Sequence, residues 1–280
     1  MTEKAISEWL MENLVNASIR AGAAAMDIYR SREPIDVSLK SDKSPLTEAD
    51  RMAHKTIKEY LGATRIPILS EEGREMLYDE RRNWELFWLV DPLDGTHEFI
   101  ERTDEFTINI ALMYNKKCVG AAIYVPCTKK LYIASRDTGA SLCCDVEPSH
   151  DAAYTFEQIQ NASQSLPLKR AERKAPIVAI SRLHNTPETF THIESLREKH
   201  PDLTIVEQGS SFKFCMLAEG SADYYIRTST TYEWDTAAGE LILAEAGGET
   251  RSFPDGEAIL YNKENLENPW FTARSPLCTL

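Results

Sequence analysis

The chain has 280 residues, which is enough for one or two domains with substantial hydrophobic cores. Its 31 lysine and arginine residues against 44 aspartate and glutamate residues give a formal net charge of −13. A nucleic-acid binder would need a basic face, so we expect no DNA or RNA polymer as a partner. No signal peptide or transmembrane segment is visible, and we expect a cytoplasmic protein, with peripheral attachment to the inner membrane face as the alternative. Composition leaves the oligomeric state open.

The first half of the chain is patterned as helices around an antiparallel sheet. Apolar residues recur at helical spacing from residue 6 to residue 28, which predicts a long first helix. The next predicted elements are a strand at 37–40, a helix at 47–61, and strands at 86–90, 106–114, 118–125 and 130–134. Short turns join the last three strands, and such hairpin-linked strands pair antiparallel.

The second half changes to alternating strands and helices. Strands are predicted at 177–180, 203–207 and 222–226, and helices at 187–199, 211–219 and 235–246. This alternation indicates an α/β arrangement, so we assign residues 1–150 to an α+β domain and residues 151–280 to an α/β domain. The polar segment 145–174 is the expected junction. Its basic cluster is predicted to be a solvated linker and consists of Lys169, Arg170, Arg173 and Lys174.

Residues 88–96, Trp-Leu-Val-Asp-Pro-Leu-Asp-Gly-Thr, concentrate the chemistry of the chain. The apolar run predicts a buried strand that Pro92 ends, because proline has no N–H to donate to the ladder. The glycine that follows lets the chain fold back, so that Asp91, the Leu93 carbonyl and Asp94 can face a common centre. Hard divalent cations, Mg²⁺ in particular, prefer such oxygens. The alternative for this segment alone is an Asp-Gly turn with two solvated aspartates.

Two further carboxylates lie at the ends of predicted elements. Glu71 follows the short apolar run 66–69 and is expected at a strand end. Asp235 opens a helix, where free N–H groups and the helix dipole favour a carboxylate, so capping alone could account for it. Acidic residues at element ends, each beside glycine or a turn, are also how a site for two or three metal ions in phosphoryl transfer is assembled.

Taken together, these motifs resemble those of the lithium-sensitive, Mg²⁺-dependent phosphatases related to inositol monophosphatase. The motifs are Glu-Glu at 71–72, Asp-Pro-Leu-Asp-Gly-Thr at 91–96, Trp-Asp-Thr-Ala-Ala-Gly at 234–239 and Ala-Gly-Gly at 246–248. The resemblance implies a layered α-β-α-β-α sandwich, α+β in its first half and α/β in its second, with the metals between the halves.

Finer details are similar to the CysQ-type 3′(2′),5′-bisphosphate nucleotidase branch of that family. They lie in the segments 42–50, 95–100, 181–184 and 209–215. Inositol monophosphatases lack an equivalent of Lys213. His97 departs from the nucleotidase pattern, which tends to have lysine there, but this departure leaves the metal site untouched.

The resemblance implies catalytic roles for three residues. Asp50 would be a general base or a third-metal ligand near the attacking water, although its spacing from Thr47 also fits a capping box. Glu71 would hold the first metal and would orient the water together with Thr96. Two or three Mg²⁺ ions would be held by Glu71, Asp91, the Leu93 carbonyl, Asp94 and Asp235. Inhibition by Li⁺ is expected from the same resemblance.

The substrate contacts also follow from the resemblance. The N–H groups of Gly95 and Thr96 could cradle the scissile phosphate, and Asp235 would lie near the leaving-group oxygen. The residues that match nucleoside and second-phosphate contacts are Ser181, His184, Gly209, Lys213 and Arg227. A lone histidine or lysine is more often a surface residue than a ligand, so these assignments depend on the motif context. Trp234 is expected to pack in the core.

The expected reaction is hydrolysis of the 3′-phosphate of 3′-phosphoadenosine 5′-phosphate to AMP and phosphate, by metal-activated water and without a covalent phosphoenzyme. The expected partner is therefore a small phosphorylated nucleotide, in sulfur assimilation or nucleotide recycling. One alternative is an inositol monophosphatase or a broader sugar-phosphate phosphatase, against which the context of Lys213 argues. Another is a phosphonucleotide sensor without turnover, against which the intact set of Asp50, Glu71 and Thr96 argues.

Overall fold

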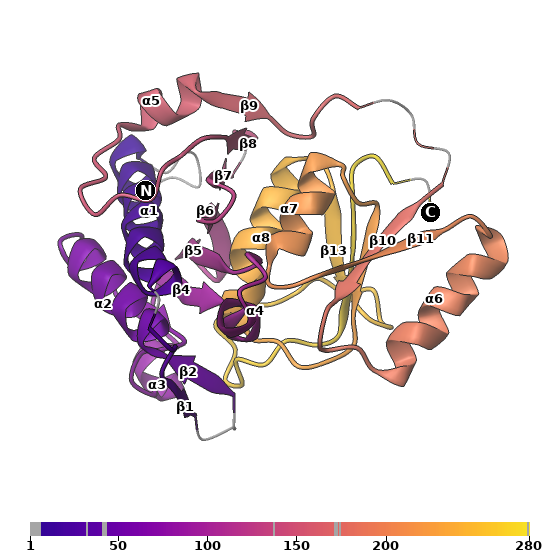
Figure 1. Ribbon diagram of the computed structural model, residues 1–280, viewed down its shortest axis with the longest axis horizontal. Helices are drawn as coiled ribbons and strands as arrows, with labels where there is room; N and C mark the ends of the chain where they lie inside the picture. The colour runs from indigo at the N-terminus through magenta and orange to yellow at the C-terminus, as the bar shows by residue number, and fades with distance from the viewer. Residues whose placement is uncertain are drawn as a thin grey trace.

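Five layers of helix and sheet build the protein, as the computed structural model in Figure 1 shows. It describes residues 7–31, 33–40, 44–136, 138–170, 173, 175–278 and 280. From one side to the other, the layers are α1 (Glu8–Arg30) with α2 (Glu48–Gly62), a seven-stranded sheet, α7 (Phe212–Glu219) with α8 (Glu233–Glu245), a five-stranded sheet, and α6 (Pro187–Lys199). The predicted α-β-α-β-α sandwich is therefore confirmed. Ile6, Asp42, Lys43 and Lys174, which the predictions include, lie outside the described residues.

The first sheet has the strand order β3-β4-β5-β6-β7-β8-β9. Its strands are β3 (Ile68–Ser70), β4 (Leu86–Asp94), β5 (Thr107–Tyr114), β6 (Lys117–Val125), β7 (Lys130–Ser135), β8 (Gly139–Cys143) and β9 (Ser163–Ser165). Only the β3–β4 pair among them is parallel, so the predicted antiparallel pairing is confirmed. The predicted division at residue 150 stays a prediction, and it falls between β8 and β9 of this one sheet.

Both faces of β4 are buried, which accounts for its uninterrupted apolar sequence. Trp88 and Val90 pack in the core under α1 and α2, whereas Phe87 and Leu89 pack in the core that α7 and α8 cover. Burying each such side chain contributes about 1.5–3 kcal/mol to the free energy of folding. β4 is thereby fixed on both sides, and its last residues reach the space between the two sheets.

The second sheet has the order β11-β10-β12-β14-β13. Its strands are β10 (Ile177–Ser181), β11 (Thr204–Gln208), β12 (Tyr224–Arg227), β13 (Glu249–Ser252) and β14 (Phe271–Arg274). β10 runs parallel to β11 and β12, as an α/β arrangement requires, and α6 packs on the outer face through Ile193. The sequence patterns predict β10, β11 and β12 but not the two antiparallel strands β13 and β14.

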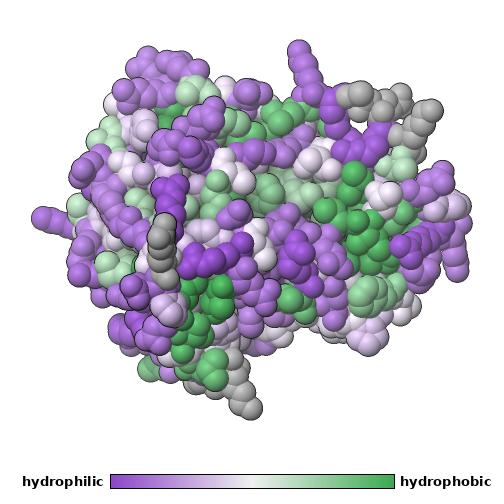
Figure 2. Space-filling view, viewed as in Figure 1, coloured by the Kyte–Doolittle hydropathy of each residue, from purple (hydrophilic) through white to green (hydrophobic). Residues whose placement is uncertain are grey.

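The smaller elements lie around this frame. They are β1 (Val37–Leu39), β2 (Pro45–Thr47), α3 (Tyr78–Arg81), α4 (Thr96–Glu101) and α5 (Phe156–Asn161). In the view of Figure 2, hydrophilic residues cover most of the surface, and apolar residues reach it at the β1–β2 hairpin, lower left, where Leu39 is exposed. Trp234 is partly buried and packs against the core, as predicted. None of the helices in the described part of the chain has both the length and the apolar character needed to cross a bilayer.

The predicted solvated linker is wrong for two of its basic residues. Arg170 donates to Asp223 at 2.8 Å and Arg173 donates to the same carboxylate at 2.9 Å. Asp223 is buried just before β12, and a buried carboxylate requires cations or N–H groups around it. The two arginines therefore fasten the linker to the second sheet.

Candidate functional site

A cavity of about 540 Å³ opens between the two sheets, which is a size suited to a small-molecule ligand. The predicted site residues that line it are Glu71, Asp91, Leu93, Asp94, Gly95, Thr96, Ser181, His184, Lys213, Arg227 and Asp235. Asp50 and Gly209 do not line it, but each contacts its wall: Asp50 accepts a hydrogen bond from Thr96, and Gly209 packs against Glu98. The structure therefore brings the predicted residues from both halves to one place.

An irregularity in β4 aims its carboxylates. The prediction that Pro92 ends the strand is wrong, because β4 continues to Asp94 and its register with β5 shifts between Asp91 and Asp94. The shift accommodates the N–H that proline lacks, and such bulges re-aim side chains. Oδ1 of Asp91 accepts a hydrogen bond from the Leu93 N–H at 3.1 Å. The carboxylates of Asp91 and Asp94 both reach the cavity.

The turn after β4 requires glycine and leads directly into α4. Gly95 has φ +93°, in the left-handed region, and a Cβ there would lie 3.3 Å from Cβ of Ser210. Thr96 is the first residue of α4, and its hydroxyl donates to Oδ1 of Asp50 at 3.0 Å. Oδ2 of Asp50 accepts from the N–H of Thr47 at 2.7 Å, which is the capping box considered from the sequence. Asp50 caps α2 and also contacts Thr96.

Three carboxylates meet at the base of the cavity. Glu71, Asp91 and Asp235 each offer an oxygen within 4.8 Å of the other two. Burial, reinforced by repulsion between these groups, raises the pKa of Asp91 and of Asp235 well above its usual value. Burial also raises the pKa of Asp94, although the Ser211 N–H donates to its Oδ2 at 2.5 Å. A hard cation would relieve this concentration of negative charge, so the donor set fits a divalent metal.

Asp235 combines the two roles that the sequence left open. It is the third residue of α8, and its Oδ2 accepts a hydrogen bond from the Tyr232 N–H at 2.8 Å. It therefore caps the helix, and it belongs to the carboxylate cluster as well. The helix N-terminus favours a negative charge at this position.

Lys40 is a residue of the site that sequence reasoning missed. Its Nζ lies 2.7 Å from Oε1 of Glu71, and it also forms an ion pair with Glu72. Burial lowers the pKa of Lys40, but the two glutamates outweigh this effect and raise it. Its position at the end of the predicted strand 37–40 gives no periodic signal that would have identified it. Lys40 offsets part of the negative charge of the cluster.

The opposite wall of the cavity carries nitrogen groups. The Ser181 hydroxyl accepts a hydrogen bond from the His184 N–H at 3.2 Å. Burial, together with the charges of Arg227 and His97, lowers the pKa of His184 to about 4, so its ring is neutral at pH 7. Nε of Arg227 is buried and has no hydrogen-bond partner among the described residues. This wall combines a neutral ring with a cation.

Lys213 is held by the backbone. Its Nζ donates to the Gln208 carbonyl at 2.8 Å and to the Ser210 carbonyl at 2.6 Å. Burial, with repulsion from Arg227, lowers its pKa to about 7. These contacts order the loop before α7. Ser211 is the last residue of this loop, and its N–H donates to Asp94. Lys213 therefore supports the side of the cavity that carries Asp94, as well as lining the cavity.

Polar residues of β5 tie that loop to the first sheet, and no sequence prediction included them. The hydroxyl of Ser211 hydrogen-bonds to Oδ1 of Asn109 and to the hydroxyl of Thr107, each at 2.8 Å. Both β5 residues are buried in an otherwise apolar strand. Polar side chains at alternate positions of a buried strand were the available signal. Glu105 adds a further link, because it accepts from the Gly209 N–H at 2.9 Å.

Comparisons with known proteins agree with this geometry. The description "Inositol monophosphatase family" belongs to the family model that matches residues 9–274. The 3′(2′),5′-bisphosphate nucleotidase CysQ of Salmonella typhimurium is 37% identical over 265 residues, which cover 94% of this chain and 98% of that protein. The protein of the same name from Escherichia coli K12 is 36% identical with the same coverage. A crystal structure of CysQ from Bacteroides thetaiotaomicron has a TM-score of 0.88 at 43% identity and covers 96% of this chain and 98% of its own.

Proposed function

Because this chain belongs to the inositol monophosphatase family, we propose that it is a metal-dependent 3′(2′),5′-bisphosphate nucleotidase. Its reaction is the hydrolysis of the 3′-phosphate of 3′-phosphoadenosine 5′-phosphate to AMP and phosphate. The observation that carries the proposal is the meeting of Glu71, Asp91 and Asp235, which come from three separate segments in both halves of the chain. The names of the relatives support the choice of substrate.

Enzymes of this family are metal-dependent, and in the function that we propose the carboxylates of the cavity hold two or three Mg²⁺ ions. The residues that would hold them are Glu71, Asp91, the Leu93 carbonyl, Asp94 and Asp235. When bound, the ions lower the pKa of a water and neutralise charge on the transferred phosphoryl group. The raised pKa values of Asp91 and Asp235 also support a cation site, because these groups take up protons when no cation offsets their charge.

The pair of Asp50 and Thr96 activates the water. The Thr96 hydroxyl donates a hydrogen bond to Asp50. The Thr96 oxygen is therefore free to accept a hydrogen bond from the water that attacks phosphorus. Burial raises the pKa of Asp50, which makes its carboxylate a stronger base. Glu71 orients the same water together with Thr96. The proton of the water can then pass through the Thr96 oxygen to Asp50.

The nitrogen-bearing wall receives the rest of the nucleotide. The neutral ring of His184, with Ser181 beside it, suits an uncharged base, and Arg227 suits the second phosphate. The N–H groups of Gly95 and Thr96 face the scissile phosphate at the start of α4. Gly209 and Lys213 order the loop that completes this side.

An assay of phosphate release tests the function. Purified protein is given 3′-phosphoadenosine 5′-phosphate, its sulfated precursor, 3′-AMP and inositol 1-phosphate, each with and without Mg²⁺. We expect Mg²⁺-dependent release of phosphate. The kcat/KM should be higher for 3′-phosphoadenosine 5′-phosphate and its sulfated precursor, which carry phosphoryl groups at both the 3′ and 5′ positions, than for 3′-AMP or inositol 1-phosphate. A higher kcat/KM for inositol 1-phosphate would replace the nucleotidase with an inositol monophosphatase, and binding of the nucleotide without turnover would indicate a sensor.

Lithium offers a second test of the same site. Li⁺ is close to Mg²⁺ in size but carries half its charge, so it can occupy a carboxylate-lined position without stabilising the transition state. At fixed ionic strength, we expect Li⁺ in place of Na⁺ to inhibit phosphate release, by an amount that changes with Mg²⁺ concentration. Equal rates in the two salts would remove the lithium-sensitive assignment.

A further inference from the structure

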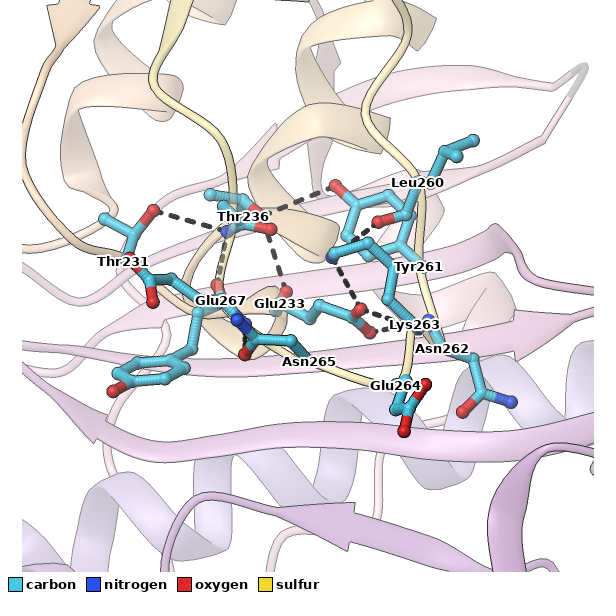
Figure 3. Close-up of polar contacts among 12 residues, drawn as sticks. Thr231, Glu233, Thr236, Leu260, Tyr261, Asn262, Lys263, Glu264, Asn265 and Glu267 are labelled. Atoms are coloured by element: carbon cyan, nitrogen blue, oxygen red, sulfur yellow. Dashed lines mark hydrogen bonds and ion pairs between the residues drawn. The ribbon is translucent and has the colours of Figure 1, made fainter. Parts of the chain in front are cut away.

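One segment of the second half lies along the N-terminal turn of α8 (Figure 3). We call residues 260–268 the strap. The Glu233 N–H donates to the Leu266 carbonyl at 3.0 Å, and the Asn268 N–H donates to the Thr231 carbonyl at 2.8 Å. Because α8 carries Asp235 in its first turn, the strap contacts the backbone that places this metal-ligand candidate.

Glu233 is the centre of these contacts. Its carboxylate is fully buried and accepts hydrogen bonds from the N–H groups of Asn262 and Lys263 at 2.6 and 3.0 Å. Nζ of Lys263 lies 2.7 Å from the same carboxylate. A buried carboxylate with three donors is geometrically fixed, so Glu233 joins the strap firmly to the first turn of α8.

The other end of the strap holds the same turn. The side-chain amide of Asn268 donates to the Tyr232 carbonyl at 2.6 Å and to the Thr236 hydroxyl at 3.0 Å. Asp235 therefore lies between residues that the strap fixes on both sides, Glu233 before it and Thr236 after it.

Arg81 connects the strap to α3, the short helix that follows Glu71 in the first half of the chain. It is buried at the end of α3, in the segment that follows Glu71, and donates to Oδ1 of Asn262 at 2.8 Å. It also donates to the carbonyls of Lys263 and Glu264 at 2.6 and 2.9 Å. α3, which follows Glu71 in the chain, and the helix that carries Asp235 are thus joined by a chain of hydrogen bonds outside the cavity.

We propose that Glu233, Lys263 and Arg81 are positioning residues that set the separation of Asp235 from Glu71 for metal binding; this rests on the proposed function. None of the three lines the cavity, so they act through the backbone. Repulsion favours separation of the two carboxylates when no cation is bound, and a fixed spacing keeps the site arranged for one. A network with a structural role alone would stabilise the fold and leave metal affinity unchanged.

The test is Mg²⁺ binding to the Glu233→Gln protein, measured by isothermal titration calorimetry beside the unsubstituted protein. Glutamine keeps the size of the side chain but loses the charge that holds Lys263 and the two N–H groups. We expect the Kd for Mg²⁺ to rise about tenfold, the lower end of the effect of removing a group that orients metal ligands. At saturating Mg²⁺, kcat should recover to within about threefold and KM for 3′-phosphoadenosine 5′-phosphate should be unchanged, because the cavity residues are intact.

Glu219→Gln is the matched control. Glu219 is also a buried glutamate paired with a lysine, Nζ of Lys130 at 2.8 Å, but it lies at the far end of α7. We expect this variant to lose thermal stability with an unchanged Kd for Mg²⁺. If Glu233→Gln behaves in the same way, the strap is structural and the proposal is overturned.

Two further variants separate the possible failures. Lys263→Met removes the ammonium contact and keeps both N–H donors, so it serves if Glu233→Gln does not fold; it too must weaken Mg²⁺ binding, and an unchanged Kd contradicts the proposal. Asp235→Asn tests the metal site itself. If it binds Mg²⁺ normally, the proposed function fails; if it binds weakly while both strap variants bind normally, only the positioning role fails.

Discussion

The buried carboxylate of Asp223 and the buried carboxylates of the cavity have opposite surroundings. Asp223 lies just before β12 of the second sheet and is paired with two arginines and with the Ile177 N–H at 2.7 Å. In the cavity, Asp91 and Asp235 face other carboxylates, and their pKa values are raised by burial and by this repulsion. A carboxylate that joins segments of the fold brings its own cations, whereas the cluster in the cavity leaves its charge for a ligand to offset.

The two surroundings also differ in their effect on the stability of the metal-free protein. Lys40 offsets charge only at the edge of the cluster, on Glu71 and Glu72. Asp91 is fully buried with a single described N–H donor, that of Leu93. Such clusters destabilise the metal-free protein and gain stability when a cation binds, because a ligand that binds only the folded state shifts the folding equilibrium. Substitution of a cavity carboxylate should therefore change activity more than stability, and substitution of Asp223 should change stability more than activity.

Asp94→Asn should have the largest effect on activity. The amide keeps the shape of the side chain but removes a charge from a site whose affinity for a hard cation depends on charge. We expect turnover of 3′-phosphoadenosine 5′-phosphate to fall by about three orders of magnitude, with thermal stability without metal unchanged or higher. Near-normal turnover at limiting Mg²⁺ would show that the metal site is assigned wrongly.

Asp223→Asn should do the reverse. It removes the charge that holds Arg170 and Arg173 in place, and we expect the free energy of unfolding to fall by about 2–3 kcal/mol. The cavity residues remain as they are, so kcat/KM of the folded protein should stay within about twofold of its original value. Urea unfolding, with assays at a temperature where the variant is folded, measures both. A loss of activity without a loss of stability would contradict the comparison.

The sequence predicts the elements with strong periodicity or strong motifs. The apolar runs of β5 and β6 and the helical spacing of α1 are long enough to be identified without tertiary contacts. β13 and β14 were missed because neither is an apolar run, and the place of each in the sheet depends on neighbours distant in sequence. The same limit applies to Pro92, whose effect on β4 depends on how β5 pairs with it.

For the site, the motifs identify residues whose chemistry is local. Asp91, Asp94 and Thr96 lie within one short segment, so a single turn brings them together. Lys40 and Arg81 act through contacts with residues far along the chain, and no spacing in the sequence connects them to their partners. The linker was misinterpreted for the same reason, since Arg170 is polar in sequence but pairs with a buried carboxylate.

Lys213→Met tests whether Lys213 supports the loop before α7 or contacts the substrate. Methionine keeps the length of the side chain and loses the two hydrogen bonds that hold the Gln208 and Ser210 carbonyls. If this support is its role, kcat/KM should fall about tenfold, or about 1.4 kcal/mol, for 3′-phosphoadenosine 5′-phosphate and for 3′-AMP alike. A loss confined to the bisphosphate would instead show that the ammonium contacts the second phosphate, as the sequence motif implies.

The last prediction is a pH dependence of the stabilisation by Mg²⁺. The pKa values of Asp91, Asp94 and Asp235 are raised in the folded, metal-free protein, so their protonated forms contribute stability that is full below pH 4 and is lost as the pH rises. A bound cation displaces those protons, and the difference in Tm with and without Mg²⁺ should widen from pH 5 to pH 7. Each displaced proton adds about 1.4 kcal/mol per pH unit to the Mg²⁺ effect. Asp94→Asn should show a shallower dependence, and an Mg²⁺ effect that is equal at pH 5 and pH 7 would mean that these carboxylates are ionised without the metal.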